Sequence, residues 1–113
     1  MANINFNTRT IADPGNGKAI PIAGMCNFVC NMTSAGAGET RTLGDPTVSG
    51  QTLGLCVDTD GGAIAITAAS GINKAGNTVM TFSDLGDSCF LAAVTQAGAL
   101  RWQVVGSDDV AFS

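Results

Sequence analysis

Apolar and polar residues alternate along most of the chain after residue 25. In segment 51–60, QTLGLCVDTD, the residues Leu53, Leu55 and Val57 share one face. Segment 99–105, ALRWQVV, repeats this spacing around Trp102. A period of two is typical of β-strands that bury one face and expose the other. The pattern therefore predicts strands, each contributing alternate residues to one core.

Glycine-rich and aspartate-rich segments separate these apolar runs. Such residues favour turns, because glycine adopts positive φ and aspartate accepts hydrogen bonds from nearby amides. No apolar pattern with a period of 3.6 residues persists long enough to predict a helix. We therefore expect an all-β fold of about eight strands in meander order. A small antiparallel β-sandwich and a short barrel both fit this pattern. The strand-like segments are 25–33, 40–43, 51–60, 63–69, 78–82, 88–96 and 99–105.

The first 24 residues lack this alternation and are rich in proline and glycine, which disfavour helices and central strands. We predict an extended N-terminal arm over residues 1–24, with a disordered tail as the alternative, and a β-domain over residues 25–113. The isoleucines and phenylalanine of the arm suggest that it docks on another surface, and the tryptophan could anchor a subunit contact. The candidate contacts with another subunit or another protein are Ile4, Phe6, Ile11, Ile20, Ile22 and Trp102.

Composition adds a second expectation, namely that much of the surface faces other protein. Charged residues make up 12% of the chain and hydrophobic residues 45%, whereas about 25% of an ordinary soluble domain is charged. No apolar run is long enough to span a membrane. The net charge is −4 and the basic residues are scattered, so nucleic acid is not an expected partner. The basic residues are Arg9, Lys18, Arg41, Lys74 and Arg101.

The four cysteines predict buried, reduced thiols. Cys26 and Cys30 would lie about 13 Å apart on one strand, too far for a disulfide. The intervals to Cys56 and Cys89 do not match a zinc site, and the chain has no histidine. The N-terminal sequence MANINFNTRT shows no secretory signal. If the chain begins at its native Met, we expect it to be made and kept, or assembled, in a cytosol.

Candidate chemistry is sparse because the chain has no histidine and no tyrosine. A Ser-His-Asp or Cys-His arrangement cannot be formed, which leaves carboxylate pairs as the remaining catalytic groups. Asp58 and Asp60 resemble the start of a calcium loop but lack the later glutamate. Asp84 and Asp87 lie in SDLGD, and residues 108–109 follow the last long strand. We interpret all three pairs as turn or loop residues, the first two as hairpin turns. A carboxylate-dependent glycan hydrolase is the enzymatic alternative. No cofactor or metal is expected.

Three longer sequence segments resemble those of a known class of proteins. They are TSAGAGETRTLGDPT, GQTLGLCVDTDGGAIAIT and GNTVMTFSDLGDSCFLAAVTQAGALRWQVV. Together they resemble small virion proteins of tailed bacteriophages, and most closely the capsid decoration, or cement, proteins. The resemblance covers roughly Thr33 to Val105 and excludes the N-terminal arm. It contains no catalytic motif.

The resemblance implies a structural virion protein that binds the outside of a phage capsid. Its partners would be the major capsid protein and two further copies of itself in a homotrimer that bridges capsid subunits. Its location would be the capsid surface of the virion, after assembly in the host cytoplasm. The resemblance assigns no individual contact residues. An alternative is a phage fibre or tail-tip module that binds a host receptor through loops such as 44–50 and 70–77.

Overall fold

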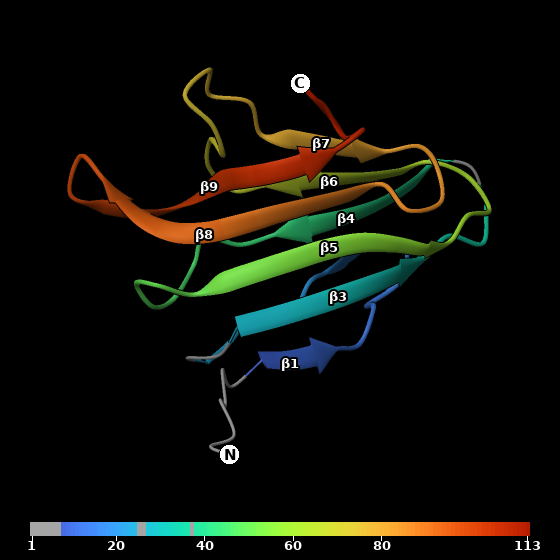
Figure 1. Ribbon diagram of the computed structural model, residues 1–113, viewed down its shortest axis with the longest axis horizontal. Coiled ribbons are helices and arrows are strands. Elements are labelled where there is room, and N and C mark those ends of the chain that lie inside the picture. Colours follow the sequence, from blue (N-terminus) through green and yellow to red (C-terminus); the bar gives the residue numbers. More distant parts are fainter. Residues whose placement is uncertain (1–7, 25–26, 37) are drawn as a thin grey trace, which may run out of the picture.

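The computed structural model describes residues 8–24, 27–36 and 38–113, which form ten β-strands and no helix. Every segment that the alternation predicts as a strand contains one (Figure 1). The strands are β1 (Thr8–Ile11), β2 (Lys18–Ala19), β3 (Asn27–Thr33), β4 (Glu39–Leu43), β5 (Thr52–Thr59), β6 (Ile64–Ala68), β7 (Val79–Phe82), β8 (Ser88–Gln96), β9 (Ala99–Asp108) and β10 (Ala111–Phe112). None of the described residues belongs to a helix that could cross a membrane.

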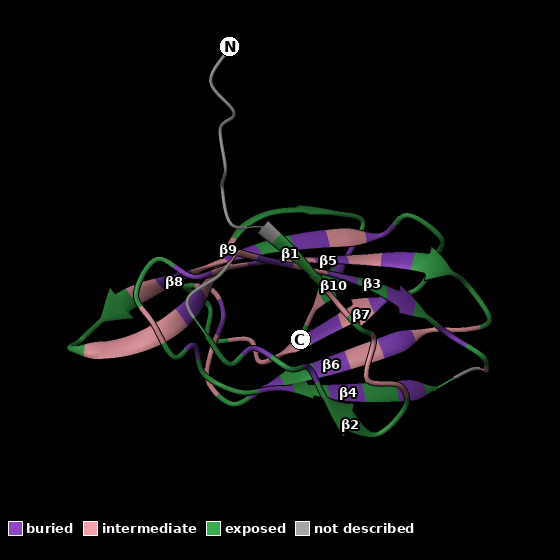
Figure 2. Ribbon diagram, turned by 90° about the horizontal axis from the view of Figure 1, so that it is seen from below, coloured by how far each residue is buried: buried purple, intermediate pink, exposed green. Residues whose placement is uncertain are grey.

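The strands form two sheets of five strands that pack face to face. Sheet A has the order β1-β3-β5-β8-β9, and sheet B has the order β10-β7-β6-β4-β2. Figure 2 shows the two layers edge on, with buried residues alternating along the strands. The prediction of an all-β sandwich is confirmed. Of the two architectures that the sequence left open, the structure has the sandwich.

The predicted antiparallel meander is wrong. From β1 to β6 the chain crosses between the sheets at every connection, so that β1, β3 and β5 lie in sheet A while β2, β4 and β6 lie in sheet B. Neighbouring strands within each of these sets are therefore parallel. Antiparallel pairing begins only later, for example between β8 and β9. The turn residues between strands are the same for a hairpin and for a step to the opposite sheet, so the sequence did not distinguish them.

The inward faces of the two sheets form one apolar core. Leu53, Leu55 and Val57 of β5 point inward as predicted, and each is at most 2% exposed. Ile64 and Ile66 of β6 face them from sheet B and are fully buried. Burying one such side chain contributes roughly 1.5–3 kcal/mol before entropy is counted. The strand alternation in the sequence therefore corresponds directly to the two layers.

Residues 8–24 of the predicted arm run extended and pair with the β-domain of their own chain. Strand β1 pairs with β3 and strand β2 pairs with β4, so the segment adds an edge strand to each sheet. Ile20 is 3% exposed and Ile22 is 8% exposed, and Ile11 packs partly buried against the same core. The proline and glycine of this segment did not prevent pairing, because each strand lies at a sheet edge.

Three of the candidate contact residues therefore require correction. Ile20, Ile22 and Trp102 are core residues of this chain and do not offer their side chains to another subunit or to a capsid. Trp102 is 2% exposed, and its indole Nε1–H donates to the carbonyl oxygen of Gly44 at 2.8 Å. Ile4 and Phe6 lie outside the described residues. Their role as contacts stays a prediction.

Candidate interaction surface

The segment SDLGD forms a tight turn, as predicted. The amide of Asp87 donates to the carbonyl oxygen of Asp84 at 3.1 Å, and Gly86 adopts a φ of 86°. The Asp87 carboxylate oxygen Oδ2 accepts hydrogen bonds from the amides of Ser83 at 2.8 Å and Asp84 at 3.0 Å. Asp87 is therefore a buried cap of this turn. The turn is not a hairpin, however, because it connects β7 of sheet B to β8 of sheet A.

A third aspartate, Asp109, lies beside this turn. Carboxylate oxygens of Asp84, Asp87 and Asp109 all lie within 4.8 Å of one another, and we call this group the three-aspartate cluster. Three carboxylates could supply part of the six to eight oxygen ligands that Ca²⁺ takes. One oxygen of Asp87 is already occupied by two amides. The sequence did not predict this grouping, because Asp109 is 22 residues away from Asp87 along the chain.

The DTDGG segment is also a local turn, as predicted. The Asp60 carboxylate accepts a hydrogen bond from the amide of Gly62 at 3.0 Å. This local contact is the aspartate turn geometry that the composition predicts. Like SDLGD, the segment joins strands of different sheets, β5 and β6.

The described cysteines are free thiols, as expected, but the predicted burial is wrong for Cys56. Cys30 and Cys89 are buried, and burial raises the pKa of each thiol to about 11. A thiol with such a pKa is almost wholly protonated near neutral pH and is a poor nucleophile. Cys56 is half-buried on the outer side of sheet A. Cys26 lies outside the described residues.

A second charged group, the Arg41 cluster, lies at the junction of the arm and both sheets. The Arg41 guanidinium, 1% exposed, binds both Asp13 carboxylate oxygens, with Nε at 2.7 Å and Nη2 at 2.8 Å. It also donates to Glu39 at 3.2 Å and to the carbonyl oxygen of Thr33 at 3.1 Å. The cluster thus joins the arm, through Asp13, to β4 of sheet B and β3 of sheet A.

Electrostatics in the Arg41 cluster favour the charged forms. Burial acts to raise the pKa of Asp13, but hydrogen bonds from Arg41 and from the amides of Thr33 and Gly15 outweigh it and lower that pKa. The pKa of Glu39 is lowered mainly by the amide of Ala35 and also by Arg41. The hydrogen bond with Asp13 leads the causes that raise the pKa of Arg41. The inward position of Arg41, two residues from Leu43 on the same strand face, was the sequence signal for this cluster.

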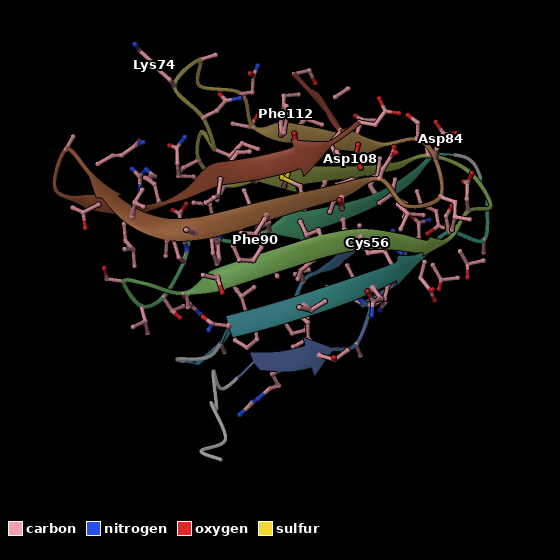
Figure 3. All side chains as sticks on the ribbon, in the orientation of Figure 1. Cys56, Lys74, Asp84, Phe90, Asp108 and Phe112 are labelled. Carbon is pink, nitrogen blue, oxygen red and sulfur yellow. The ribbon has the colours of Figure 1, made fainter. Side chains whose placement is uncertain are left out.

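The outer face of sheet A, meaning the outward side chains of β3, β5, β8 and β9, has an apolar centre. Phe90 is 44% exposed there, and Val105 is 63% exposed. Phe90 lies opposite Gly54 on β5 and opposite Gly106 on β9. A bulge at this point makes Val105 the extra residue of β9, because Leu91 pairs with Val104. Figure 3 shows Phe90 on β8, the strand that lies between β5, which carries Cys56, and β9, which carries Asp108.

The glycines on either side of Phe90 leave a hollow in the outer face of sheet A. Its volume is about 330 Å³, and its lining includes Cys56, Ser88, Phe90 and Asp108. Glycine within a strand often marks a place where another chain or a ligand approaches the backbone closely. Exposed apolar patches on soluble proteins commonly mark sites of protein contact. The arrangement therefore suits binding of another protein surface.

Charged residues occur only at the two ends of this outer face, as far as the described strands show. Asp58 of β5 and Asp108 of β9 lie at one end, and Arg101 of β9 lies at the other. Arg101 is partly exposed and makes a loose ion pair with Asp45 at 3.8 Å. Exposed pairs of this length contribute little to stability. The outer face of sheet A is thus an uncharged surface with opposite charges at its ends.

Comparison with known proteins adds no further information about function. No protein-family model matches the chain, and no curated protein matches it significantly.

Proposed function

We propose that this chain is a structural virion protein that binds the outside of a phage capsid and stabilises it as a trimer by bridging major capsid proteins. The observation that carries the proposal is the outer face of sheet A, which is uncharged at its centre and exposes Phe90 and Val105. Such a surface favours contact with protein, in this proposal between the copies of the trimer, and the predicted capsid contacts Ile4 and Phe6 lie in the N-terminal arm. The phage assignment rests on the sequence resemblance of residues 33–105.

The proposed stabilisation follows from linked equilibria. A protein that binds only assembled shells shifts the equilibrium toward assembly by mass action. Three linked binding sites in a trimer raise the effective concentration for the second and third contacts. A sandwich whose arm is fixed by the Arg41 cluster suits this role, because little conformational freedom is lost when a rigid surface binds.

Capsid binding is tested by mixing the protein with empty shells of the parent phage. We expect it to sediment with the shells at saturable stoichiometry and to raise the temperature at which the shells disassemble. A protein that stays in the supernatant at micromolar concentration would contradict the proposal. Binding to host cells instead of shells would favour the fibre or tail-tip alternative.

The predicted contacts Ile4 and Phe6 provide a matched pair of variants for this experiment. The variant Ile4→Asn/Phe6→Asn removes the apolar side chains, whereas Ile4→Leu/Phe6→Leu keeps their apolar character. If these residues contact the capsid, the first variant should lose about tenfold or more in shell affinity, and the second should bind like the wild type. Equal binding by both variants would remove Ile4 and Phe6 from the contact.

A further inference from the structure

We propose that the outer face of sheet A binds a second copy of this chain, with the Arg101 end of one copy over the Asp108 end of the next. This inference rests on the proposed function, because it assigns the surface that builds the trimer. A self-association surface must carry both halves of the contact. The outer face of sheet A carries a ridge, a hollow, a cation and two carboxylates.

The centre of the contact is the Phe90 ridge with the hollow beside it. Phe90 Cδ1 lies 3.6 Å from the position that a Cβ of Gly54 would occupy, so the ring covers that glycine. A Cβ at Gly106 would meet no atom within 4 Å, so the other side of the ring is open. An apolar side chain of another copy can therefore reach the β9 backbone beside Phe90. Val105, which is exposed next to this opening, is a side chain of the right kind.

The opposite charges at the two ends of the outer face of sheet A favour another copy of this chain as its binding partner. Arg101 and Asp108 are seven residues apart on β9, which corresponds to roughly 20 Å along a strand. The midpoint between them falls at Val104 and Val105, between the pairs Leu91–Val104 and Phe90–Gly106. Three copies that turn this face toward a three-fold axis place the Arg101 end of each copy against the Asp108 end of the next, while their apolar centres meet at the axis. A partner with uniform charge would not satisfy both ends.

The β8–β9 hairpin, which carries Arg101, projects beyond the rest of sheet A. Strand β5 pairs with β8 only as far as Ala92, whereas β8 and β9 continue to pair as far as Gln96 and Ala99. The hairpin therefore extends beyond the neighbouring strands, as Figure 1 shows at the end opposite to the SDLGD turn. A two-stranded hairpin is marginally stable alone in water. Contact with the next copy would support it, and a head-to-tail contact of this kind closes as a ring of three in the proposed trimer.

A charge-exchange series tests the inference through native mass, measured by light scattering across a dilution series. We expect Arg101→Asp and Asp108→Arg, each alone, to raise the dissociation constant of the oligomer by about tenfold or more. The double variant Arg101→Asp/Asp108→Arg should regain assembly, because the opposite charges meet again. The control Lys74→Asp makes the same charge change as Arg101→Asp on an exposed residue of the 69–78 loop, outside this face, and should assemble like the wild type.

A second variant addresses the apolar centre independently of charge. Phe90→Ser removes the exposed ring and should also shift the protein toward monomer, while its circular dichroism and melting curve show that it is folded. A wild-type monomer at every concentration would overturn the inference, as would oligomers that the charge variants leave unchanged or a double variant that stays dissociated.

Capsid shells added to the same variants separate this inference from the proposed function. If the single charge variants keep the wild-type mass and still bind shells, the self-association surface is wrong and the function stands. If the charge-exchange series behaves as expected but no oligomer binds shells, the surface is supported and the capsid function is wrong.

Discussion

The Arg41 cluster and the three-aspartate cluster use the same side chain in different ways. In the first, Asp13 shares both carboxylate oxygens with one buried guanidinium, so that charge is matched by charge. In the second, no described cation accompanies Asp84, Asp87 and Asp109, and Asp87 is held by backbone amides. An aspartate in a glycine-rich loop therefore fixes a long-range junction when its partner is a distant guanidinium, and only a local turn when its partners are neighbouring backbone amides.

The largest effect should come from removing the cation of the Arg41 cluster. Arg41→Met would leave the carboxylates of Asp13 and Glu39 without their charged partner, and Asp13 would lose its link to sheet B. Breaking a buried pair by deleting one member typically costs about 3–5 kcal/mol. We expect a loss of this size in urea unfolding. Lys74→Met, at an exposed site, is the control and should change the free energy of unfolding by at most about 0.5 kcal/mol. Similar midpoints for the two variants would contradict a structural role for the cluster.

Acid should weaken the Arg41 cluster selectively. The pKa values of Asp13 and Glu39 lie below their ordinary values of 3.8 and 4.5 in the folded chain. Their contribution to stability is therefore fully present above those ordinary values and is lost as pH falls through the folded pKa values. The free energy of unfolding, measured from pH 6 down to pH 2, should fall in this window. The Asp13→Asn variant should be less stable at pH 6 and show a shallower fall. A parallel pH profile would mean that Asp13 does not titrate as described.

An intermediate effect is expected from the buried member of the three-aspartate cluster. Asp87→Ala would leave the amides of Ser83 and Asp84 without their acceptor. An unsatisfied buried polar group costs about 1–3 kcal/mol. Asp84→Ala keeps both amides bonded and removes only an exposed carboxylate, so it is the matched control. Thermal melting of the two variants should show a clear loss for the first and almost none for the second.

The smallest effect should have the opposite sign. Asp109 adopts a φ of 61° and adds a third carboxylate to the cluster. Asparagine tolerates this φ, so Asp109→Asn removes the charge without adding backbone strain. We expect a gain of about 0.5 kcal/mol at low salt that shrinks in 1 M NaCl, because repulsion between exposed charges is screened. A loss of stability would indicate that the Asp109 carboxylate is needed for a favourable contact.

The sequence predicted the strands and their inward faces because alternation is a local property. Leu53, Leu55 and Val57 are inward in sheet A as the period of two requires. The short turns were also predicted, since Asp60 and Asp87 bond amides within four residues. The pairing of the strands was not predicted, because the partner of a strand depends on the sheet to which the chain continues after the next turn. The three-aspartate cluster and the link from Asp13 to Arg41 depend on that same long-range choice.

The apolar centre of the outer face of sheet A also could not be predicted, because it depends on how distant strands pair. Phe90 followed the expected alternation, but its position between Gly54 and Gly106 needed the register of three strands. The sequence likewise indicated apolar residues at 20 and 22 without showing that the core of their own chain encloses them.

Because the chain alternates between the two sheets, neither sheet can be completed until strands from both ends of the described sequence are present. Sheet A includes strands from Thr8 to Asp108, and sheet B includes strands from Lys18 to Phe112, so neither sheet belongs to one half of the sequence. No fragment can then fold as a smaller version of the whole, and long-range pairing of this kind is slow to form. A ribosome releasing this chain would hold two incomplete sheets with open apolar faces until the last strands emerge. Folding and protection from aggregation are therefore completed together, once β9 and β10 have emerged.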